Sequence, residues 1–451
     1  MPSPEPEDVM PDSMDGGTVI SEAAQLDSID PVNPIDIVDA MSIPVCSSHD
    51  PLSDARRTAS TASHKESMPV YKFVLTGGPC AGKTTALARV STFFKEKGFR
   101  VFTVPEAATS MFTNGLGLKD LGSPTKSFAF QWSILSLQIA SEDAFERCAR
   151  VCGQPSILLC DRGLMDGSVY MRKEEWARLA KSNGMDELTL RDGRYDGIFH
   201  LVTVACGAEE HYSLDNNEAR TESVEMARDV DARTEGVWLG HPCHMLFDNS
   251  TGFDAKMDRI VSATSRIVGL PCRPRKLGKF LLTQPPPPLE EFPVRTEEFN
   301  SEKVGCQAWP CANAACNSVF LLRCDPSEGR PDAGSVLNVG DGAVCVSTEL
   351  FLEKRGRNGL FVYRRVAIFG YDDGTVAEVT TNLSAGEYER LERDTADPVR
   401  PTVFQRRVAF LWEGQAFELH TDVGPAHGIS VLHRRSEGGE LSLPTFLSVD
   451  D

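Results

Sequence analysis

The stretch "TGGPCAGKTT", residues 76–85, constrains this chain more than any other part of its sequence. It places Gly77, Gly82, Lys83 and Thr84 at the spacing G-x-x-x-x-G-K-[ST]. Glycines let backbone N–H groups turn inward around an anion, and a helix that begins near Lys83 adds the positive end of its dipole. The spacing predicts a loop that cradles a polyphosphate, in which Lys83 reaches the β- and γ-phosphates and the Thr84 hydroxyl binds Mg²⁺.

The sequence on both sides of the loop supports this prediction over a chance glycine turn. Residues 71–76 form a continuous apolar run, as expected of a strand buried on both faces. Residues 84–98 carry apolar side chains at helical spacing and end at Gly98, a favoured residue after a helix. We therefore predict that one continuous set of residues contacts the nucleotide phosphates: Gly77, Gly78, Pro79, Cys80, Ala81, Gly82, Lys83, Thr84 and Thr85. Cys80 is interpreted either as a small spacer or as a redox-sensitive thiol.

The remaining pattern predicts an α/β P-loop NTPase domain followed by a β domain. Further strands are expected at 99–106, 156–163, 195–204 and 244–249. They alternate with helical segments, which predicts a parallel sheet flanked by helices over residues 69–282. After a proline-rich linker, short alternating runs predict an antiparallel, barrel-like β domain. The predicted boundaries are a disordered acidic tail at 1–68, the linker at 283–295, and the β domain at 296–451 with an insertion at 306–335.

Composition excludes several classes of protein. The chain has 451 residues and a formal net charge of −19, so a non-specific nucleic-acid binder, which needs a basic surface, is not expected. No apolar run reaches membrane-spanning length, and the N-terminus lacks the pattern of a secretory signal. The 13 cysteines are therefore expected to be reduced thiols in the cytoplasm.

Three acidic residues are candidates for metal binding and catalysis. Asp161 ends a buried strand, where it is expected to hold Mg²⁺ through water or, alternatively, to cap the next helix. Glu106 lies where ligands gather in such sheets, and with Asp166 it is a candidate to orient or deprotonate a substrate. Both are equally open to interpretation as surface carboxylates. With Lys83, these three acids complete the predicted catalytic set.

The segment "NNEARTESVEMARDVDAR" (216–233) resembles a lid that closes over phosphates. Within it, Arg220 and Arg233 are predicted to neutralise phosphate charge, although a solvated helix face is the simpler alternative. No Asn-Lys-x-Asp stretch occurs, so the residues alone do not choose between GTP and ATP.

Taken in order, several motifs resemble the TRPL translocation defect protein family. They include the phosphate loop, "VPEAAT", "LLCDRGLMDGSVY", "RYDGIFHLVT", "NNEARTE", Trp238–Pro242 and "DN" followed by "F-x-x-K-x-x-R". The resemblance implies a P-loop domain similar to the nicotinamide riboside kinase type and a C-terminal domain related to the CYTH fold. It also implies GTP binding, phosphoinositide binding, and a role in trafficking of membrane-protein cargo, peripherally at membranes. Matching basic positions in the C-terminal domain are Lys354, Arg355, Arg364, Arg365, Arg406 and Arg407.

The arginine pairs also carry an argument of their own. Arg364 and Arg365 are adjacent on one expected strand, and Arg406 and Arg407 on another, so only one of each pair points inward. Two inward arginines on neighbouring strands suit a phosphate group. The alternative is that these arginines face solvent and protect a sheet edge.

Three functions remain open from the sequence. The first is a regulatory protein that binds GTP or ATP with Mg²⁺ and a phosphoinositide headgroup. The second is a small-molecule kinase that transfers the γ-phosphate to a nucleoside-like acceptor. The third is a scaffold in which nucleotide is structural. A zinc site in the cysteine cluster that begins at Cys306 is a weaker hypothesis, because the four-residue separations only just fit zinc spacing.

Overall fold

A computed structural model describes residues 68–182, 184–212, 223–272, 278–307, 345–424, 428–435 and 440–449. These residues all fall within one compact unit, 65–451. The predicted disordered tail at 1–68 lies outside the described residues except for Met68. The predicted insertion at 306–335 lies outside them except for Cys306 and Gln307.

The first domain contains the predicted parallel sheet. Its five strands lie in the order β2-β3-β1-β4-β5, and every neighbouring pair is parallel. The strands are β1 (Val70–Thr76), β2 (Arg100–Val104), β3 (Ser156–Asp161), β4 (Gly197–Leu201) and β5 (His244–Phe247). The predicted fold class is confirmed for this domain.

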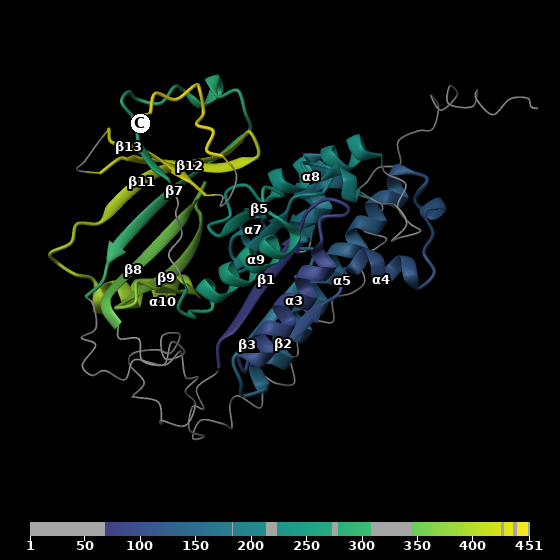
Figure 1. The fold of residues 1–451 in the computed structure, drawn as a ribbon, viewed down its shortest axis with the longest axis horizontal. Coiled ribbons are helices and arrows are strands. Elements are labelled where there is room, and N and C mark those ends of the chain that lie inside the picture. Colours follow the sequence, from purple (N-terminus) through teal and green to yellow (C-terminus); the bar gives the residue numbers. More distant parts are fainter. Residues whose placement is uncertain are drawn as a thin grey trace, which may run out of the picture. The chain divides into compact units, whose positions relative to one another are not determined.

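Helices cover both faces of this sheet because its strands are apolar on both faces (Figure 1). Along β1, Phe73 and Leu75 pack in the core with α3 (Lys83–Glu96) and α9 (Phe253–Ile267). Val74, which points the other way, packs in the core beneath α5 and α6. The other helical segments are α4 (Ala107–Thr113), η1 (Leu118–Leu121), α5 (Pro124–Val151), η2 (Leu164–Tyr170), α6 (Lys173–Ser182), α7 (Glu187–Arg191), η3 (Glu209–His211) and α8 (Val224–Val237).

The second domain is an antiparallel sheet, as predicted. Eight strands lie in the order β10-β9-β8-β7-β11-β12-β13-β6. The strands are β6 (Lys279–Leu281), β7 (Thr296–Gly305), β8 (Cys345–Arg357), β9 (Leu360–Tyr371), β10 (Val376–Leu383), β11 (Val403–Trp412), β12 (Gln415–Asp422) and β13 (Ser430–Arg434). Among the described residues β10 and β6 are the two ends of this order, so the strand pairs do not close it into a ring.

One helix of the second domain begins with a capping box. The helix α10 (Ala385–Thr395) begins after Ser384, whose hydroxyl accepts a hydrogen bond from the Glu387 N–H. The Glu387 carboxylate in turn accepts from the Ser384 N–H at 2.7 Å, which completes a capping box. A short turn, η4 (Leu289–Glu291), lies in the proline-rich segment.

The second sheet begins earlier than the predicted boundary at 282/283. The strand β6 pairs with β13, and Leu282 forms a bridge with Val449. Leu282 also packs in the core of the β domain, which explains why this segment joins that sheet. The bridges of Val268 with Val379 and of Cys272 with Val376 connect the end of the first domain to the edge strand β10.

No helix within the described residues is long and apolar enough to cross a bilayer.

Candidate nucleotide-binding and catalytic site

The phosphate loop connects β1, which ends at Thr76, to α3, which begins at Lys83. Gly77 has a φ of 132° and Gly82 a φ of 88°, values that L side chains rarely adopt. A Cβ atom at Gly77 would overlap the Leu201 carbonyl oxygen, because β4 passes directly behind the loop. The glycines at these positions are therefore required by the backbone geometry.

Lys83 lies across the phosphate loop, where it is predicted to contact the β- and γ-phosphates. Its ammonium donates hydrogen bonds to the carbonyl oxygens of Gly77 at 3.1 Å and Gly78 at 2.8 Å. Burial, together with the nearby positive charge of Arg162, lowers the pKa of Lys83 to about 7. Three carboxylates partly oppose this shift: Asp161, Glu106 and Asp166. The site thus contains a poorly compensated cation, which an anionic phosphate would stabilise.

A buried carboxylate of α8 holds the loop from behind. The Gly78 N–H donates to Asp231 Oδ1 at 2.5 Å, and the Thr203 N–H donates to Asp231 Oδ2 at 3.3 Å. His200 Nε2 lies 3.2 Å from Asp231 Oδ1, and despite its burial the pKa of His200 is raised by this carboxylate. Asp231 therefore links α8 directly to the phosphate loop.

A buried lysine of α9 holds the loop from another side. Lys256 Nζ donates to the carbonyl oxygens of Ala81 at 3.4 Å and Val202 at 2.8 Å, and to Asn249 Oδ1 at 2.8 Å. The Thr203 hydroxyl also donates to the Pro79 carbonyl oxygen at 2.5 Å. Asp231, Lys256 and Asn249 are not among the site residues predicted from the sequence. The one sequence signal for them was the "DN" and "F-x-x-K" motif, which contains the latter two.

Two of the three predicted acids lie beside Lys83. Asp161 ends β3, and Glu106 immediately precedes α4. Glu106 Oε1 lies 3.6 Å from Arg162 Nε, and its other oxygen accepts from the Thr109 hydroxyl at 2.6 Å. Arg162 adopts a left-handed backbone conformation with a φ of 72°. This turn follows β3 directly and leaves the guanidinium beside Glu106.

The third acid, Asp166, is buried and accepts three hydrogen bonds from the protein. Its Oδ1 accepts from the Thr76 hydroxyl at 2.8 Å and from Trp238 Nε1 at 2.7 Å. Its Oδ2 accepts from the Gly163 N–H at 3.0 Å. These contacts suit a positioning residue that joins β1, η2 and α8, while the predicted catalytic role of Asp166 stays a prediction.

The residues present fit a Mg²⁺ ion bound with the nucleotide. Asp161 Oδ1 is buried and accepts no hydrogen bond from any described residue. Burial, followed by the charge of Glu106, raises the pKa of the Asp161 carboxyl, so a cation there would stabilise its ionised form. Thr84 is exposed in the first turn of α3, where its hydroxyl is free of the core. Asp161 and Thr84 are the residues that would hold the ion.

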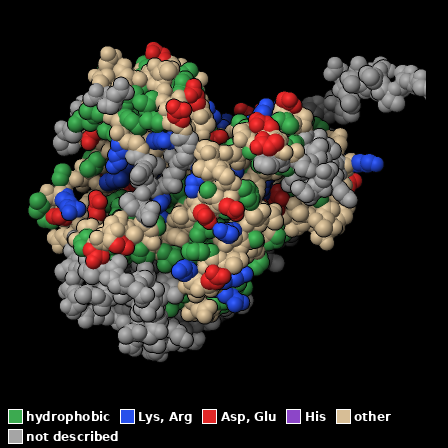
Figure 2. Space-filling view, viewed as in Figure 1, with side chains coloured by type: hydrophobic (Ala, Val, Ile, Leu, Met, Phe, Trp, Pro, Cys, Tyr) green, Lys and Arg blue, Asp and Glu red, His purple; other side chains and the backbone are tan. Residues whose placement is uncertain are grey.

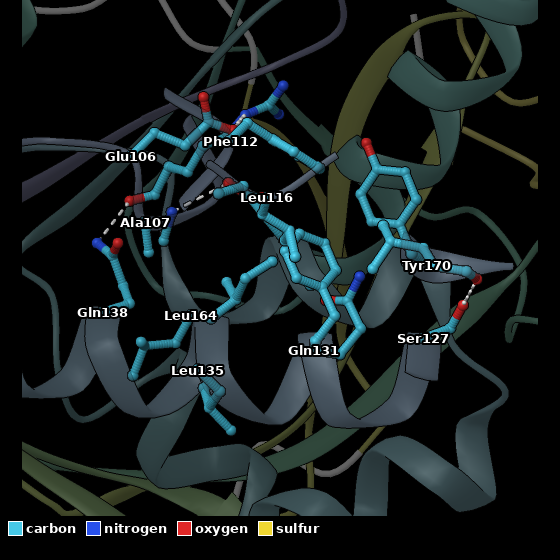
Figure 3. A pocket seen from close by; sticks show the side chains of 18 of the residues that line it. Glu106, Ala107, Phe112, Leu116, Ser127, Gln131, Leu135, Gln138, Leu164 and Tyr170 are labelled. Atoms are coloured by element: carbon cyan, nitrogen blue, oxygen red, sulfur yellow. Dashed lines mark hydrogen bonds and ion pairs between the residues drawn. The ribbon is translucent and has the colours of Figure 1, made fainter. Parts of the chain in front are cut away.

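A cavity of about 610 Å³ opens from the same group of charges. Glu106, Arg162 and Asp166 line one end of it, and α4 and α5 supply most of its walls. Figure 3 shows Glu106 and Gln138 at one end and Ser127 and Tyr170 at the other. Clefts of this volume accommodate small-molecule ligands. The cavity therefore lies beside the predicted phosphate site and has room for a small molecule.

Comparison with known families agrees with this geometry. Residues 72–256 match the family model described as an AAA domain. The matched range begins in β1 and ends at Lys256, so it contains the whole phosphate loop and its supports. Domains of this P-loop type bind nucleotide with Mg²⁺, and a nucleotide-binding P-loop domain is therefore assigned to this part of the chain. No curated protein matches the sequence.

The predicted lid of the AAA domain is only partly described. Arg220 lies outside the described residues. Arg233 lies on α8, where it donates to the Val169 carbonyl oxygen at 3.2 Å and pairs with Asp229 at 2.9 Å. It does not contact the phosphate loop in this arrangement, and its role on a closed lid stays a prediction.

The six predicted anion-binding residues of the β domain divide between the two faces of its sheet. Arg355 and Arg407 are almost fully buried, and Arg364 is nearly so. By contrast, Arg406 is 40% exposed and pairs with Glu298 at 3.3 Å. Lys354 pairs with Glu302 at 3.7 Å, also away from the buried face. Arg365 lies opposite Leu352 in the ladder, next to Arg364, so it occupies the other face.

Five cations gather on the inner face, and we call them the cation cluster: Lys303, Arg355, Arg364, Arg407 and Arg435. Within the described ranges the four arginines form ion pairs with two buried carboxylates, Glu353 and Glu418, and the charge of Lys303 also acts on Glu353. Desolvation and neighbouring arginines lower the pKa of Lys303 to about 8. Figure 2 shows a group of Lys and Arg side chains on the β-domain part of the molecular surface in view. The inner face therefore has positive charge in excess of its buried anions.

Lys303, Arg435 and both carboxylates are not among the anion-site residues predicted from the sequence. The cluster also contacts the AAA domain, since Arg355 donates to the Gly240 carbonyl oxygen at 2.6 Å and Arg435 to that of Pro242 at 3.2 Å. These contacts connect the cluster to the segment that follows α8. No group of three or more His, Cys, Asp or Glu arranged for a metal occurs in the described ranges, and the predicted zinc cysteines after Cys306 lie outside them.

We expect the buried side chain of Glu235, on α8, to make the free energy of unfolding depend on pH. Its Oε1 is buried and has no hydrogen-bond partner in the described part of the chain. Desolvation raises the pKa of Glu235 from 4.5 to about 7, against the opposing charge of His200. Because the folded pKa exceeds the unfolded one, the folded state loses stability as pH rises from about 4.5 to about 7. We expect Glu235→Gln to increase the free energy of unfolding at high pH. The increase should be about 2–3 kcal/mol larger at pH 8.5 than at pH 4.5.

The measurement is urea unfolding of both proteins across this pH range. Glu389→Gln, on the exposed side of α10, is the matched control and should give the same difference at both pH values. A Glu235→Gln protein whose stability follows that of the unmodified protein at every pH would contradict the buried, proton-binding role.

Proposed function

We propose that the AAA domain is a small-molecule kinase. A nucleoside triphosphate binds with Mg²⁺ at residues 77–85, and its γ-phosphate passes to a hydroxyl of a molecule in the neighbouring cavity. The single observation that supports this most is that Glu106, Arg162 and Asp166 both line the cavity and act electrostatically on Lys83. One group of charges therefore faces both binding sites.

Each charged residue between the phosphate loop and the cavity has surroundings that suit a particular role. Lys83 supplies positive charge to the β- and γ-phosphates, and Arg162 stabilises the charge on the group in transfer. Glu106 accepts the proton of the attacking hydroxyl, because it stands at the mouth of the cavity and is about one-third exposed. Mg²⁺, when bound, neutralises phosphate charge. Resemblance to the TRPL translocation defect protein family favours GTP as the nucleotide, with ATP as the alternative.

Glu106→Gln tests the proposal. We expect the rate of phosphoryl transfer to fall by about 10²- to 10⁴-fold, because the proton acceptor is lost, while nucleotide affinity changes by less than about threefold. The measurement uses γ-labelled ATP and GTP with a panel of nucleosides, apolar alcohols and inositol phospholipids. Glu96→Gln, at the exposed end of α3, should leave transfer unchanged. Label transfer at full rate by the Glu106→Gln protein would remove Glu106 from the mechanism.

A second candidate function is regulatory, and the cation cluster favours it. Five buried or partly buried cations beside two carboxylates suit a ligand with several phosphate groups. Such a protein would bind nucleotide without transferring phosphate, and would bind phosphoinositide headgroups in the cytoplasm, peripherally at membranes, in the trafficking of membrane-protein cargo. Stoichiometric retention of GTP without label transfer to any acceptor in the panel would favour this candidate over the kinase.

A further inference from the structure

The walls of the cavity beside the AAA-domain site are mostly apolar. Phe112 of α4 and Phe130 of α5 pack with their ring centroids 5.3 Å apart, and both line the cavity. Leu116, Leu121 and Ile134 add aliphatic surface and are only half-buried. A concave, mostly apolar surface of this kind on a folded domain marks a site for an apolar ligand.

The polar groups of the cavity are few, and most are already in use. Gln138 donates to Glu142 at 3.0 Å and to the Arg162 carbonyl oxygen at 3.4 Å. The Ser127 hydroxyl donates to the Leu121 carbonyl oxygen at 3.2 Å. Gln131 lies between them on the same face of α5, as Figure 3 shows, and no interaction with a described residue is found for its amide.

Charge is confined to the end of the cavity that faces Lys83. Glu106 and Arg162 form an ion pair there, and Asp166 accepts three hydrogen bonds from the protein. Toward the other end the wall is mostly aromatic and aliphatic, with the Gln131 amide and the Ser127 hydroxyl as its polar groups, up to the ring of Tyr170, which is 59% exposed. A ligand is therefore met by charge at one end and mostly by hydrocarbon along the rest of its length.

We infer that the acceptor is a largely apolar alcohol or phenol, in which the hydroxyl lies at Glu106 and the hydrocarbon body lies along α5. This inference rests on the proposed kinase function and replaces the nucleoside-like acceptor expected from the sequence. A nucleoside carries several sugar hydroxyls and the polar edge of its base. Against these walls most of those groups would lose their hydrogen bonds to water without replacement, at about 1–3 kcal/mol each. The uncommitted Gln131 amide provides for one further polar group.

The reaction is a balanced displacement. The acceptor oxygen forms a bond to the γ-phosphorus, and the bond from that phosphorus to the β–γ bridging oxygen breaks. The bridging oxygen keeps the electron pair and leaves as part of the nucleoside diphosphate. The hydroxyl proton passes to the Glu106 carboxylate, so the products are a phosphate monoester and a diphosphate.

The test compares two apolar probes, farnesol and 2-naphthaleneethanol, with two polar ones, uridine and nicotinamide riboside. Full-length protein is first shown to retain a fluorescent nucleotide, and binding and label transfer are then measured for each probe. We expect the apolar alcohols to bind and to accept label at least tenfold better than the nucleosides. Preferred binding or labelling of a nucleoside would overturn the inference, as would nucleotide retention without binding of either apolar alcohol.

Variants of α5 locate the binding in the cavity. Ile134→Glu places a carboxylate in the apolar wall, and Ser127→Trp fills the far end from an exposed position. Each should weaken binding of the apolar alcohols at least tenfold and leave nucleotide retention unchanged. The control Leu137→Glu changes a residue of the same helix that is 40% exposed and does not line the cavity. If the unmodified protein fails to retain nucleotide, the kinase proposal itself is wrong. This outcome differs from preferred labelling of a nucleoside, which would overturn only the inference about the acceptor.

Discussion

Replacing Lys83 with alanine is expected to lower the affinity for nucleoside triphosphate by at least about 100-fold. Among the described residues its ammonium donates only to the carbonyl oxygens of Gly77 and Gly78, so within this part of the chain its charge has no ion-pair partner at hydrogen-bonding distance. A bound polyphosphate provides that partner in a site where water is scarce. Losing one member of a buried charge pair typically costs about 2–5 kcal/mol of binding free energy. The measurement is titration with a fluorescent nucleotide in the presence of Mg²⁺.

Lys95→Ala is the matched control, because it removes the same charge from the exposed last turn of the same helix. Its affinity should stay within about twofold of the unmodified protein, since exposed charges are screened. The phosphate loop would lose its assigned role if the two variants bound nucleotide equally well.

The low pKa of Lys83 adds a pH signature to this prediction. With a pKa of about 7, most of the ammonium has lost its proton at pH 8 in the free protein. Phosphate stabilises the charged form and so raises the pKa in the complex. Binding at pH 8 should therefore take up nearly one proton per nucleotide, and binding at pH 6 should take up almost none. Calorimetry in buffers of different ionisation enthalpy measures this uptake, and proton release at pH 8 would contradict the assignment.

The parts of the fold that the sequence predicted depend on local signals. The β1–loop–α3 unit combines an apolar run, three glycines and a helical period within 30 residues, and each feature constrains the next. The arginine pairs were also predictable in part, because alternation along a strand determines that only one of each pair faces inward. Arg407 is buried and Arg406 is exposed for this reason.

The parts that could not be predicted depend on contacts between distant segments. Asp231 meets Gly78 across 153 positions of the chain, and Lys256 meets Ala81 across 175. Nothing in the sequence near either residue specifies its partner. The strand β6 was missed because three residues carry too little pattern and gain their stability from pairing with β13. The ion pairs of Glu353 and Glu418 could not be predicted either, because they depend on the strand register that places both carboxylates among arginines.

Glu353 carries the second large prediction: Glu353→Gln should lower the free energy of unfolding by about 3–5 kcal/mol. Its carboxylate is buried, pairs with Arg364, lies 3.0 Å from Arg407 and accepts from the Ser301 hydroxyl at 3.3 Å. Despite its burial, the arginines hold the pKa of Glu353 well below its ordinary value. Its stabilising effect is therefore present above about pH 4.5 and is lost as pH falls further, so the two proteins should converge in stability under acid.

Glu302→Gln is the control for this effect. Glu302 neighbours the cluster on β7 but faces outward, where it pairs with Lys354 at 3.7 Å and is 26% exposed. An exposed pair of this kind contributes at most about 1 kcal/mol. Urea unfolding at pH 7 compares both variants with the unmodified protein. A loss at Glu353 no larger than the loss at Glu302 would show that the cluster does not depend on its carboxylates.

The same variant separates a structural role of the cation cluster from an anion-binding one. Removing the Glu353 charge leaves Lys303, Arg364 and Arg407 with less compensation, so a multiply charged anion should gain affinity for the inner face. Inositol hexakisphosphate should then restore stability to Glu353→Gln more than it stabilises the unmodified chain, by mass action. The comparison is made in a Lys83→Ala background, so that the phosphate loop does not take up the probe. Equal shifts in the two proteins would mean that the buried carboxylates already satisfy the arginines, and phosphoinositide binding would then have to be located elsewhere on the β domain.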